Sequence, residues 1–317
     1  MKIAVLEPLG ITEKEIRAIA KPITDKGHEL IIYNDKVTEI EALKERTKDM
    51  DVVVLANMPL KGEVIESSDK LKLISVAFTG VDHVDLEVCK ENHIVVSNSA
   101  GYSTPSVSEL TYGLIISLLR NIVPLDDASR KGKTMTGFNQ ADLYGKTLGV
   151  IGTGAIGKRV AEIGLAFGCK VLAYNRTENE ELKNKGVTYL PLEELLGESD
   201  IVTIHLPLTK DTRGLIDARK LKLMKENALL INTARGPIID NKALAEALKN
   251  GQLGGAGIDV FDMEPPLPLE YSLLGSPNTV LTPHIGFATK EAMKRRAQIT
   301  FENIICWLDG NPQNRVI

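Results

Sequence analysis

Cysteine, aromatic side chains and long apolar runs are all scarce in this chain of 317 residues. Its three cysteines, Cys89, Cys169 and Cys306, are odd in number and far apart, which favours reduced packing thiols over disulfides or a zinc site. No apolar run approaches the roughly 20 residues of a membrane span, and the run in MKIAVLEPLG is too short for a secretion signal. We therefore expect a cytoplasmic protein with no metal site and no membrane partner.

The chain also has no excess of basic residues. The chain has 38 lysines and arginines against 42 acidic residues, a net charge of -4, with both signs interspersed. This balance offers no basic face to nucleic acid. With 43% hydrophobic and 25% charged residues, the composition is that of an ordinary globular protein, and the length indicates about two domains.

Two series of strand and helix patterns follow each other along the chain. In the first, apolar β-branched runs at 3–6, 29–33, 51–56, 71–78 and 94–98 alternate with amphipathic stretches, which is typical of a parallel sheet buried on both faces. The second series begins at TLGVIG and contains six strand patterns, the number in a complete dinucleotide-binding sheet. A long apolar helix at 103–120 joins the two series. A helix at about 289–308 ends the chain, and we expect it to return to the first domain.

Between the first two elements of the second series lies GTGAIG, which has the spacing G-x-G-x-x-G. Gly152 would make the tight turn, Gly154 would let the backbone approach a pyrophosphate, and Gly157 would let helix and strand pack closely. The alternative is a glycine turn without a ligand, but the strand before it, the helix after it and five further strands favour a dinucleotide site. We predict an α/β fold with two domains. A Rossmann dinucleotide-binding domain would span 99–287, and a flavodoxin-like parallel-sheet substrate domain would combine 1–98 with 288–317.

About 20 residues after the glycine motif, a dinucleotide-binding domain is expected to carry an acidic residue that holds the ribose hydroxyls. The sequence VLAYNRT has Asn175, Arg176 and Thr177 there instead. A cation flanked by small donors can hold a 2′-phosphate, so this corner of the chain, residues 175–177, favours NADP over NAD. The alternative for Arg176 is a solvated surface arginine, and three nearby acids would repel a phosphate: Glu178, Glu180 and Glu181.

Three polar residues stand at the ends of later strand patterns: Arg235 in INTARGPIID, Glu264 in DVFDMEPP and His284 in VLTPHIG. Together with FTGVDHVDL at 78–86 and PLTKDTRGLI at 207–216, these motifs resemble the D-2-hydroxyacid dehydrogenase family over nearly the whole chain. Several such motifs in order are far more specific than any one. The resemblance implies an oxidoreductase that transfers a hydride between NAD(P)H and a small 2-oxo acid, giving a D-2-hydroxy acid. DMEPP and PHIGFAT are most similar to the hydroxypyruvate and glycerate branch, so the resemblance implies a hydroxypyruvate or glyoxylate reductase of the D-glycerate dehydrogenase type.

In this resemblance Arg235, Glu264 and His284 form the catalytic triad. Arg235 can clamp a carboxylate with two hydrogen bonds, and His284 can give a proton to the carbonyl oxygen. Glu264 would hold the imidazole in position. Taken singly, the three could be a surface arginine, a turn glutamate and a histidine that closes a strand.

The resemblance also implies the binding residues. Backbone N–H groups in a glycine turn can donate hydrogen bonds to an anion, and the resemblance places the substrate at one such turn and at a second loop. The substrate set is Asn57, Thr79, Gly80, Val81, Arg235 and His284. The cofactor set is Thr104, Gly152, Gly154, Ala155, Ile156, Gly157, Asn175, Arg176, Thr177, His205, Pro207, Thr212, Thr233, Ala234, Asp259 and Gly286.

The chain departs from the family after the long helix, where RKGKT places Thr134 at a position that is a tryptophan in many members. The substrate pocket is then either more open or closed by Phe138. The resemblance suggests a homodimer through the Rossmann domains, to which the apolar helix at 103–120 would contribute surface. Two other functions stay open on the same fold: a nucleotide-sensing, corepressor-like binding protein, and a phosphoglycerate dehydrogenase.

Overall fold

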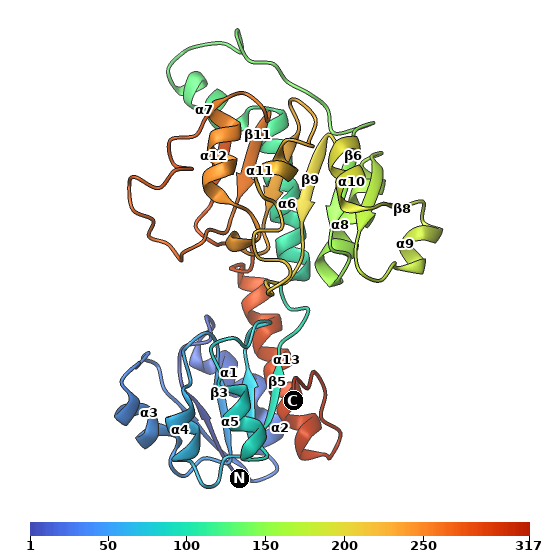
Figure 1. Ribbon diagram of the computed structural model, residues 1–317. Coiled ribbons are helices and arrows are strands. Elements are labelled where there is room, and N and C mark those ends of the chain that lie inside the picture. Colours follow the sequence, from blue (N-terminus) through green and yellow to red (C-terminus); the bar gives the residue numbers. More distant parts are fainter. The chain divides into compact units, whose positions relative to one another are not determined.

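The computed structural model describes all 317 residues and divides into two compact units, unit 1 (Met1–Ser103 with Thr289–Ile317) and unit 2 (Thr104–Ala288). Figure 1 draws both as ribbons. The division falls where two helices start, α6 (Thr104–Leu119) and α13 (Lys290–Leu308). The boundaries expected at 98/99 and 287/288 lie slightly earlier in the chain, because turn residues 99–103 stay with the first unit.

Unit 1 is built on one parallel sheet of five strands in the order β2-β1-β3-β4-β5. This order is that of flavodoxin-like folds, so the predicted class of the first domain is confirmed. Its strands are β1 (Lys2–Val5), β2 (Glu29–Ile32), β3 (Val52–Leu55), β4 (Leu73–Val76) and β5 (Val95–Asn98). Its helices are α1 (Glu13–Ile19), α2 (Lys21–Thr24), α3 (Ile40–Thr47), α4 (Gly62–Glu66), α5 (Leu86–Glu91) and α13.

Alternate residues of the strands in unit 1 belong to two hydrophobic cores, one on each face of the sheet. Ile3 and Val5 of β1 belong to a cluster that includes Phe301 of α13, whereas Ala4 belongs to a cluster on the other face. Successive side chains of a strand point to opposite faces, so a sheet covered on both sides needs apolar residues throughout. The last helix thus completes the core of the unit that begins the chain.

Unit 2 contains a parallel sheet of seven strands in the order β12-β11-β10-β9-β6-β7-β8. Its strands are β6 (Thr147–Ile151), β7 (Lys170–Tyr174), β8 (Thr188–Tyr189), β9 (Ile201–Ile204), β10 (Leu229–Asn232), β11 (Gly255–Ile258) and β12 (Thr279–Leu281). Besides α6, its helices are α7 (Ile122–Arg130), α8 (Ala155–Ala166), α9 (Glu180–Asn184), α10 (Leu192–Glu198), α11 (Ala218–Leu221), η1 (Gly236–Ile238) and α12 (Asn241–Lys249). The predicted count of six missed β8, which is too short to show a pattern.

The strand order of unit 2 reverses direction between β6 and β9, and this point fixes where a ligand can bind. In open α/β sheets the crevice at such a switch point, outside the carboxyl ends of the strands, is the ligand site. Gly152 follows β6 and His205 follows β9, so both lie at this point. The fold places the glycine motif where a dinucleotide site belongs.

Helix α6 is apolar nearly all round because it lies in the core of unit 2. It packs against α8 and against β10, β11 and β12, and Leu114 and Ile115 are fully buried. Its apolar character is therefore explained within one chain. No helix of the protein is both long and apolar enough to traverse a bilayer.

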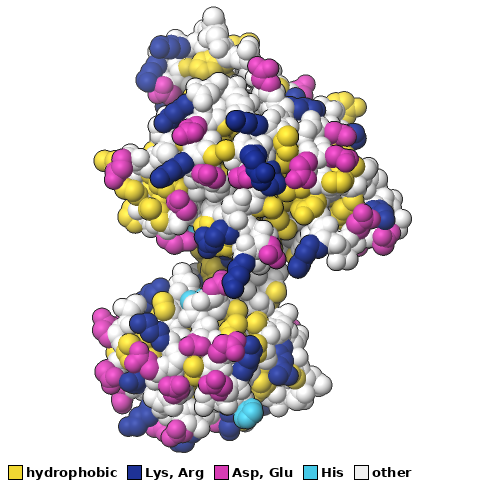
Figure 2. Space-filling view, viewed as in Figure 1, with side chains coloured by type: hydrophobic (Ala, Val, Ile, Leu, Met, Phe, Trp, Pro, Cys, Tyr) yellow, Lys and Arg dark blue, Asp and Glu magenta, His cyan; other side chains and the backbone are white.

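The surface carries both signs of charge. Figure 2 shows lysine and arginine side chains interspersed with aspartate and glutamate on the viewed face of both units. Many of these charges form short-range pairs, such as Lys21 with Asp25 and Lys131 with Asp127. Exposed pairs of this kind contribute little to stability, but they leave no broad patch of one sign on this face.

Candidate active site

The glycine loop of unit 2 is tight where it packs and open where a ligand would approach. Gly152 has φ +93°, and a Cβ there would lie 2.7 Å from the carbonyl oxygen of His205. A Cβ on Gly157 would lie 1.8 Å from the carbonyl oxygen of Gly152, so no side chain fits. A Cβ on Gly154 would meet nothing within 4 Å. This open position lies at the N-terminus of α8, whose first residues are Ala155 and Ile156, and its shape fits a bound pyrophosphate.

His205 closes the other side of this switch point. Its backbone N–H donates to the carbonyl of Ile151 at 2.7 Å, and its Nε2 lies 2.9 Å from Thr203 Oγ1. Burial lowers the pKa of the His205 imidazole to about 3, so the ring is neutral at physiological pH. In the loop that follows, Thr212 Oγ1 donates to the carbonyl of Pro207 at 2.7 Å. These contacts make a fixed, uncharged rim.

The corner after β7 is held by its own side chains. Asn175 Nδ2 donates to the carbonyl of Thr177 at 2.7 Å, whereas Arg176 and Thr177 are exposed. Arg176 forms no ion pair within its unit. The three neighbouring acids are all paired with lysines: Glu178 and Glu180 with Lys183, and Glu181 with Lys158 and Lys185. The two lysines on Glu181 lower the pKa of that carboxylate to about 2.

Arg235 lies in a turn organised by Asn232, the fully buried last residue of β10. The Asn232 side chain accepts from the N–H of Ala234 and donates to the carbonyl of Arg235, each at 3.0 Å. A Cβ on Gly236 would overlap the backbone of Phe261, so this turn packs directly on the segment that leads to Glu264. The Arg235 guanidinium donates to the carbonyl of Ala234 and has no carboxylate partner within its unit, which leaves it able to bind an anion.

The structure brings Glu264 and His284 together, as the sequence predicted. Nδ1 of His284 lies 3.0 Å from Oε2 of Glu264, and the ring meets Phe287 edge to face at 5.2 Å. A carboxylate can only accept, so Nδ1 carries the proton and Nε2 remains for another partner. The His284 side chain is 22% exposed and that of Glu264 is 79% exposed. The imidazole is thus oriented from one side and accessible from the other.

His284 is held in a conformation that few side chains adopt, with φ +59°. Asp259, 1% exposed, fixes this turn: Oδ1 accepts from Thr282 Oγ1 at 2.6 Å and from Ile285 N at 2.8 Å, and Oδ2 accepts from Gly286 N at 2.9 Å. The N–H of His284 also donates to the Asp259 carbonyl at 2.9 Å. The sequence suggested Asp259 as a cofactor contact, but its carboxylate is largely used to shape the histidine turn.

Two further cofactor candidates in unit 2, Thr104 and Thr233, lie at element ends, and Thr233 is buried. Thr104 is the first residue of α6, and the Thr233 hydroxyl lies 3.1 Å from that of Thr111 on the same helix. The Thr233 side chain therefore joins α6 to the end of β10. Its hydroxyl already has a partner in the protein.

The candidate substrate residues of unit 1 lie on two loops that touch. Leu60 N donates to the carbonyl of His83 at 2.8 Å, and Asp85 N donates to the carbonyl of Leu60 at 3.2 Å. These bonds join the loop of Asn57 to the loop of Thr79, Gly80 and Val81. The N–H groups of those three residues donate to no acceptor within the unit, so they are free to bind an anion.

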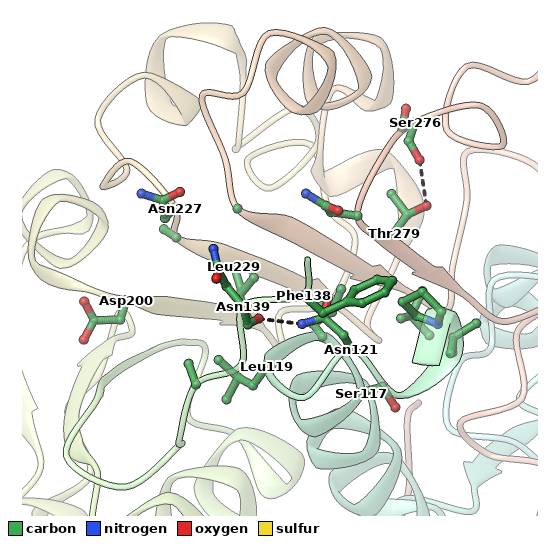
Figure 3. Close-up of a pocket in the computed structure, with 18 of the residues that line it drawn as sticks. Ser117, Leu119, Asn121, Phe138, Asn139, Asp200, Asn227, Leu229, Ser276 and Thr279 are labelled. Atoms are coloured by element: carbon green, nitrogen blue, oxygen red, sulfur yellow. Dashed lines mark hydrogen bonds between the residues drawn. The ribbon is translucent and has the colours of Figure 1, made fainter. Parts of the chain in front are cut away.

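A cavity of unit 2, about 850 Å³, lies at the other end of the strands. Asp200, Leu229 and Thr279, which line it, stand at the amino ends of β9, β10 and β12 (Figure 3). Phe138 lies in this cavity beside Asn121. None of the predicted site residues lines it. Within its own chain Phe138 lies at the amino ends of the strands, whereas Arg235 and His284 follow the carboxyl ends of β10 and β12. Closure of a substrate pocket by Phe138 stays a prediction.

Sequence reasoning missed the residues that position the site. Asn232 shapes the arginine turn, and Glu7 of unit 1 accepts hydrogen bonds from the N–H groups of Ala56 and Met58. Each is a polar residue directly at the end of an apolar strand pattern, and that signal could have singled them out. No group of three or more histidine, cysteine or acidic side chains is arranged to hold a metal ion.

The sheet order, the open glycine loop and the oriented histidine define a dinucleotide-binding oxidoreductase fold. Residues 112–286 match the model of the D-isomer specific 2-hydroxyacid dehydrogenase family, NAD binding domain. The chain belongs to this family, and unit 2 is its nicotinamide dinucleotide-binding domain.

Individual relatives match over almost their whole length. The chain is 36% identical to a glyoxylate reductase of Korarchaeum cryptofilum, over 98% of this chain and 96% of that one. It is 39% identical to a glycerate dehydrogenase of Methylorubrum extorquens, over 91% and 92%. Among solved structures, a D-lactate dehydrogenase from Aquifex aeolicus complexed with NAD and lactic acid superposes with a TM-score of 0.84, at 32% identity and covering 98% and 96%. An acyclic imino acid reductase in complex with NADPH and D-Arg superposes with a TM-score of 0.88, at 31% identity and covering both chains fully.

Proposed function

We propose that the protein reduces small 2-oxo acids to D-2-hydroxy acids with NAD(P)H, and that hydroxypyruvate or glyoxylate is its substrate. The observation that carries the proposal is the His284–Glu264 pair, 3.0 Å apart, on a turn anchored by buried Asp259. Relatives named glyoxylate reductase and glycerate dehydrogenase support the choice of substrate.

The residues of the chain account for each polar part of the reaction. Arg235 holds the substrate carboxylate with two hydrogen bonds and polarises the adjacent carbonyl. When bound, the reduced nicotinamide supplies the hydride that adds to the carbonyl carbon. His284 gives its proton to the carbonyl oxygen, so a hydroxyl forms. Glu264 orients the ring through its hydrogen bond to Nδ1, and in the reverse reaction the same imidazole takes the proton back.

In unit 1 the free N–H groups of Thr79, Gly80 and Val81 are proposed to bind the substrate carboxylate, with Asn57 shaping the pocket. Backbone donors at the end of a strand form such an anion site without a charged side chain. We propose unit 1 as the substrate domain and unit 2 as the dinucleotide-binding domain, with the limits of the two units as the domain limits.

The experiment that tests the proposed activity follows NADPH and NADH oxidation with hydroxypyruvate, glyoxylate and pyruvate. We expect turnover with at least the first two. His284→Gln should lower kcat at least 100-fold, because general acid catalysis contributes about 10²–10⁴-fold. If the cofactor binds and no 2-oxo acid is reduced, the chain is the nucleotide-sensing, corepressor-like protein instead. Preference for 3-phosphohydroxypyruvate would make it a phosphoglycerate dehydrogenase.

We also propose NADP as the preferred cofactor, on the basis of the corner after β7. Pairing with Lys158, Lys183 and Lys185 compensates the acids that would repel a 2′-phosphate. Arg176, unpaired and exposed, then supplies an uncompensated cation.

Arg176→Asp tests this preference. The variant should shift the ratio of kcat/KM for NADPH to that for NADH at least 10-fold toward NADH, because a cation becomes an anion beside the phosphate. Arg159→Asp, on the surface of α8, is the matched charge control and should shift the ratio far less. An unchanged ratio in Arg176→Asp would mean that the corner is only a surface turn.

A further inference from the structure

Beneath the substrate loops of unit 1 lies a buried carboxylate that the proposed mechanism does not use. Glu7 follows β1 and is 3% exposed. Its Oε1 accepts from the N–H of Ala56 at 2.7 Å and from the N–H of Met58 at 2.8 Å, on either side of Asn57. A carboxylate with two backbone donors fixes this loop firmly.

Lys36 reaches the same place from the loop after β2. Its Nζ donates to Asn57 Oδ1 at 3.0 Å and lies 3.6 Å from Glu7 Oε2. The side chain remains 44% exposed. An ammonium group has three N–H donors, so at most two are used here and one remains available. Asn57 and Glu7 thus hold the Lys36 ammonium group at the loop, and one of its N–H donors stays free.

The charge of Lys36 is largely compensated, and this decides what it can recognise. Glu7 already supplies the opposite charge, so a second anion such as a phosphate would be placed near a buried carboxylate and be repelled by it. A neutral hydroxyl can accept a hydrogen bond from the ammonium without adding charge. The position is therefore suited to a hydroxyl on the substrate.

We propose that Lys36 is a specificity-determining residue that donates a hydrogen bond to a hydroxyl on C3 of the 2-oxo acid. The inference rests on the proposed function, in which the loops at Asn57 and Thr79 bind substrate. This hydrogen bond would select hydroxypyruvate among the small 2-oxo acids, because glyoxylate and pyruvate have no C3 hydroxyl. A site built to hydrogen-bond a hydroxyl discriminates strongly against analogues that lack it.

The test compares Lys36→Met with wild type on hydroxypyruvate and glyoxylate under the same cofactor. We expect kcat/KM for hydroxypyruvate to fall about 10-fold or more and that for glyoxylate to change less than about 3-fold, the difference corresponding to one charged hydrogen bond. Lys61→Met is the matched control, because Lys61 lies on the same loop at the start of α4 and contacts neither Glu7 nor Asn57. It should leave the ratio of the two substrates unchanged.

Removing Lys36 alone leaves Glu7 buried without its counter-charge and could disturb the loop. The double variant Glu7→Gln/Lys36→Met removes both charges, while the amide oxygen of the introduced glutamine can still accept from the two N–H groups. It should show the same loss of selectivity. Equal losses on both substrates, or none, in the double variant would overturn the inference. If wild type reduces neither acid, the proposed function itself has failed. That result differs from a failure of the Lys36 inference, in which wild type is active but the double variant keeps its selectivity or loses activity equally on both acids.

Discussion

At the scale of single residues, His205 makes the stability of the protein depend on pH. Burial lowers the pKa of its imidazole to about 3, against about 6.5 in an unfolded chain. Between these values the unfolded chain binds a proton that the folded chain does not. The stabilisation is therefore complete above about pH 6.5 and is lost as the pH falls toward 3.

We predict that His205→Gln removes this part of the pH dependence. Glutamine can keep the hydrogen bond to Thr203 but does not titrate. Between about pH 8.0 and about pH 5.5, wild type should lose about 1.4 kcal/mol more unfolding free energy than the variant, an upper limit because His205 is only partly buried as a residue. Urea unfolding without cofactor at both pH values measures the difference. Equal losses in the two proteins would show that the ring protonates freely in the folded state.

At the scale of elements, two glycines of one loop serve different purposes. Gly157 lets α8 pack on the turn after β6, and an added Cβ would overlap the Gly152 carbonyl at 1.8 Å. Gly154 has backbone angles of φ -67° and ψ -167°, which alanine adopts without strain, and an added Cβ meets no protein atom within 4 Å. Gly157 is required by the fold and Gly154 by the ligand.

These roles predict opposite effects of the same substitution. Gly154→Ala should leave the melting temperature within about 2 °C of wild type but weaken dinucleotide binding at least 10-fold, because its methyl group occupies the space of the pyrophosphate. Gly157→Ala should unfold several degrees lower, since helix and strand must separate. Thermal unfolding and fluorescence titration with NADPH separate the two effects. Unweakened binding in Gly154→Ala would contradict the assigned cofactor loop.

At the scale of the whole molecule, we propose a homodimer formed by the outer segment of unit 2. Because α6 is occupied by its own core, it offers less free surface than its apolar sequence suggested. The segment from α7 to β6, at the outside of unit 2 in Figure 1, exposes apolar side chains instead. They are Ile122 at 48%, Val123 at 55%, Met135 at 65% and Tyr144 at 79%. Large apolar side chains left exposed along one segment can mark an interface.

The double variant Ile122→Asp/Val123→Asp should convert the dimer to a monomer. Two charges cannot be buried without partners, so the interface should open while each chain stays folded. Light scattering after size-exclusion chromatography measures the mass. Leu269→Asp, at a residue 93% exposed elsewhere in unit 2, is the control and should stay dimeric. A wild-type mass near 34.6 kDa would show that the protein is a monomer and end the proposal.

The sequence by itself determined the fold class, the glycine loop and the His284–Glu264 pair. Strands buried on both faces must be apolar throughout, so the strands of both sheets were visible as apolar runs, apart from the two-residue β8. Tight turns and close approaches admit only glycine, so the loop was visible as spacing. Polar residues that end parallel strands meet at one edge of the sheet, which is why separated motifs predicted one site.

Only the tertiary structure decided which polar residues support others. Asp259 was predicted as a ligand contact, yet its carboxylate holds the turn of His284 through bonds to residues more than 20 positions away. Lys36 and Glu7 meet at Asn57 because β2, β1 and β3 lie side by side in the sheet. Hydrogen bonds across neighbouring strands depend on sheet order and register, and neither leaves a local pattern in the sequence.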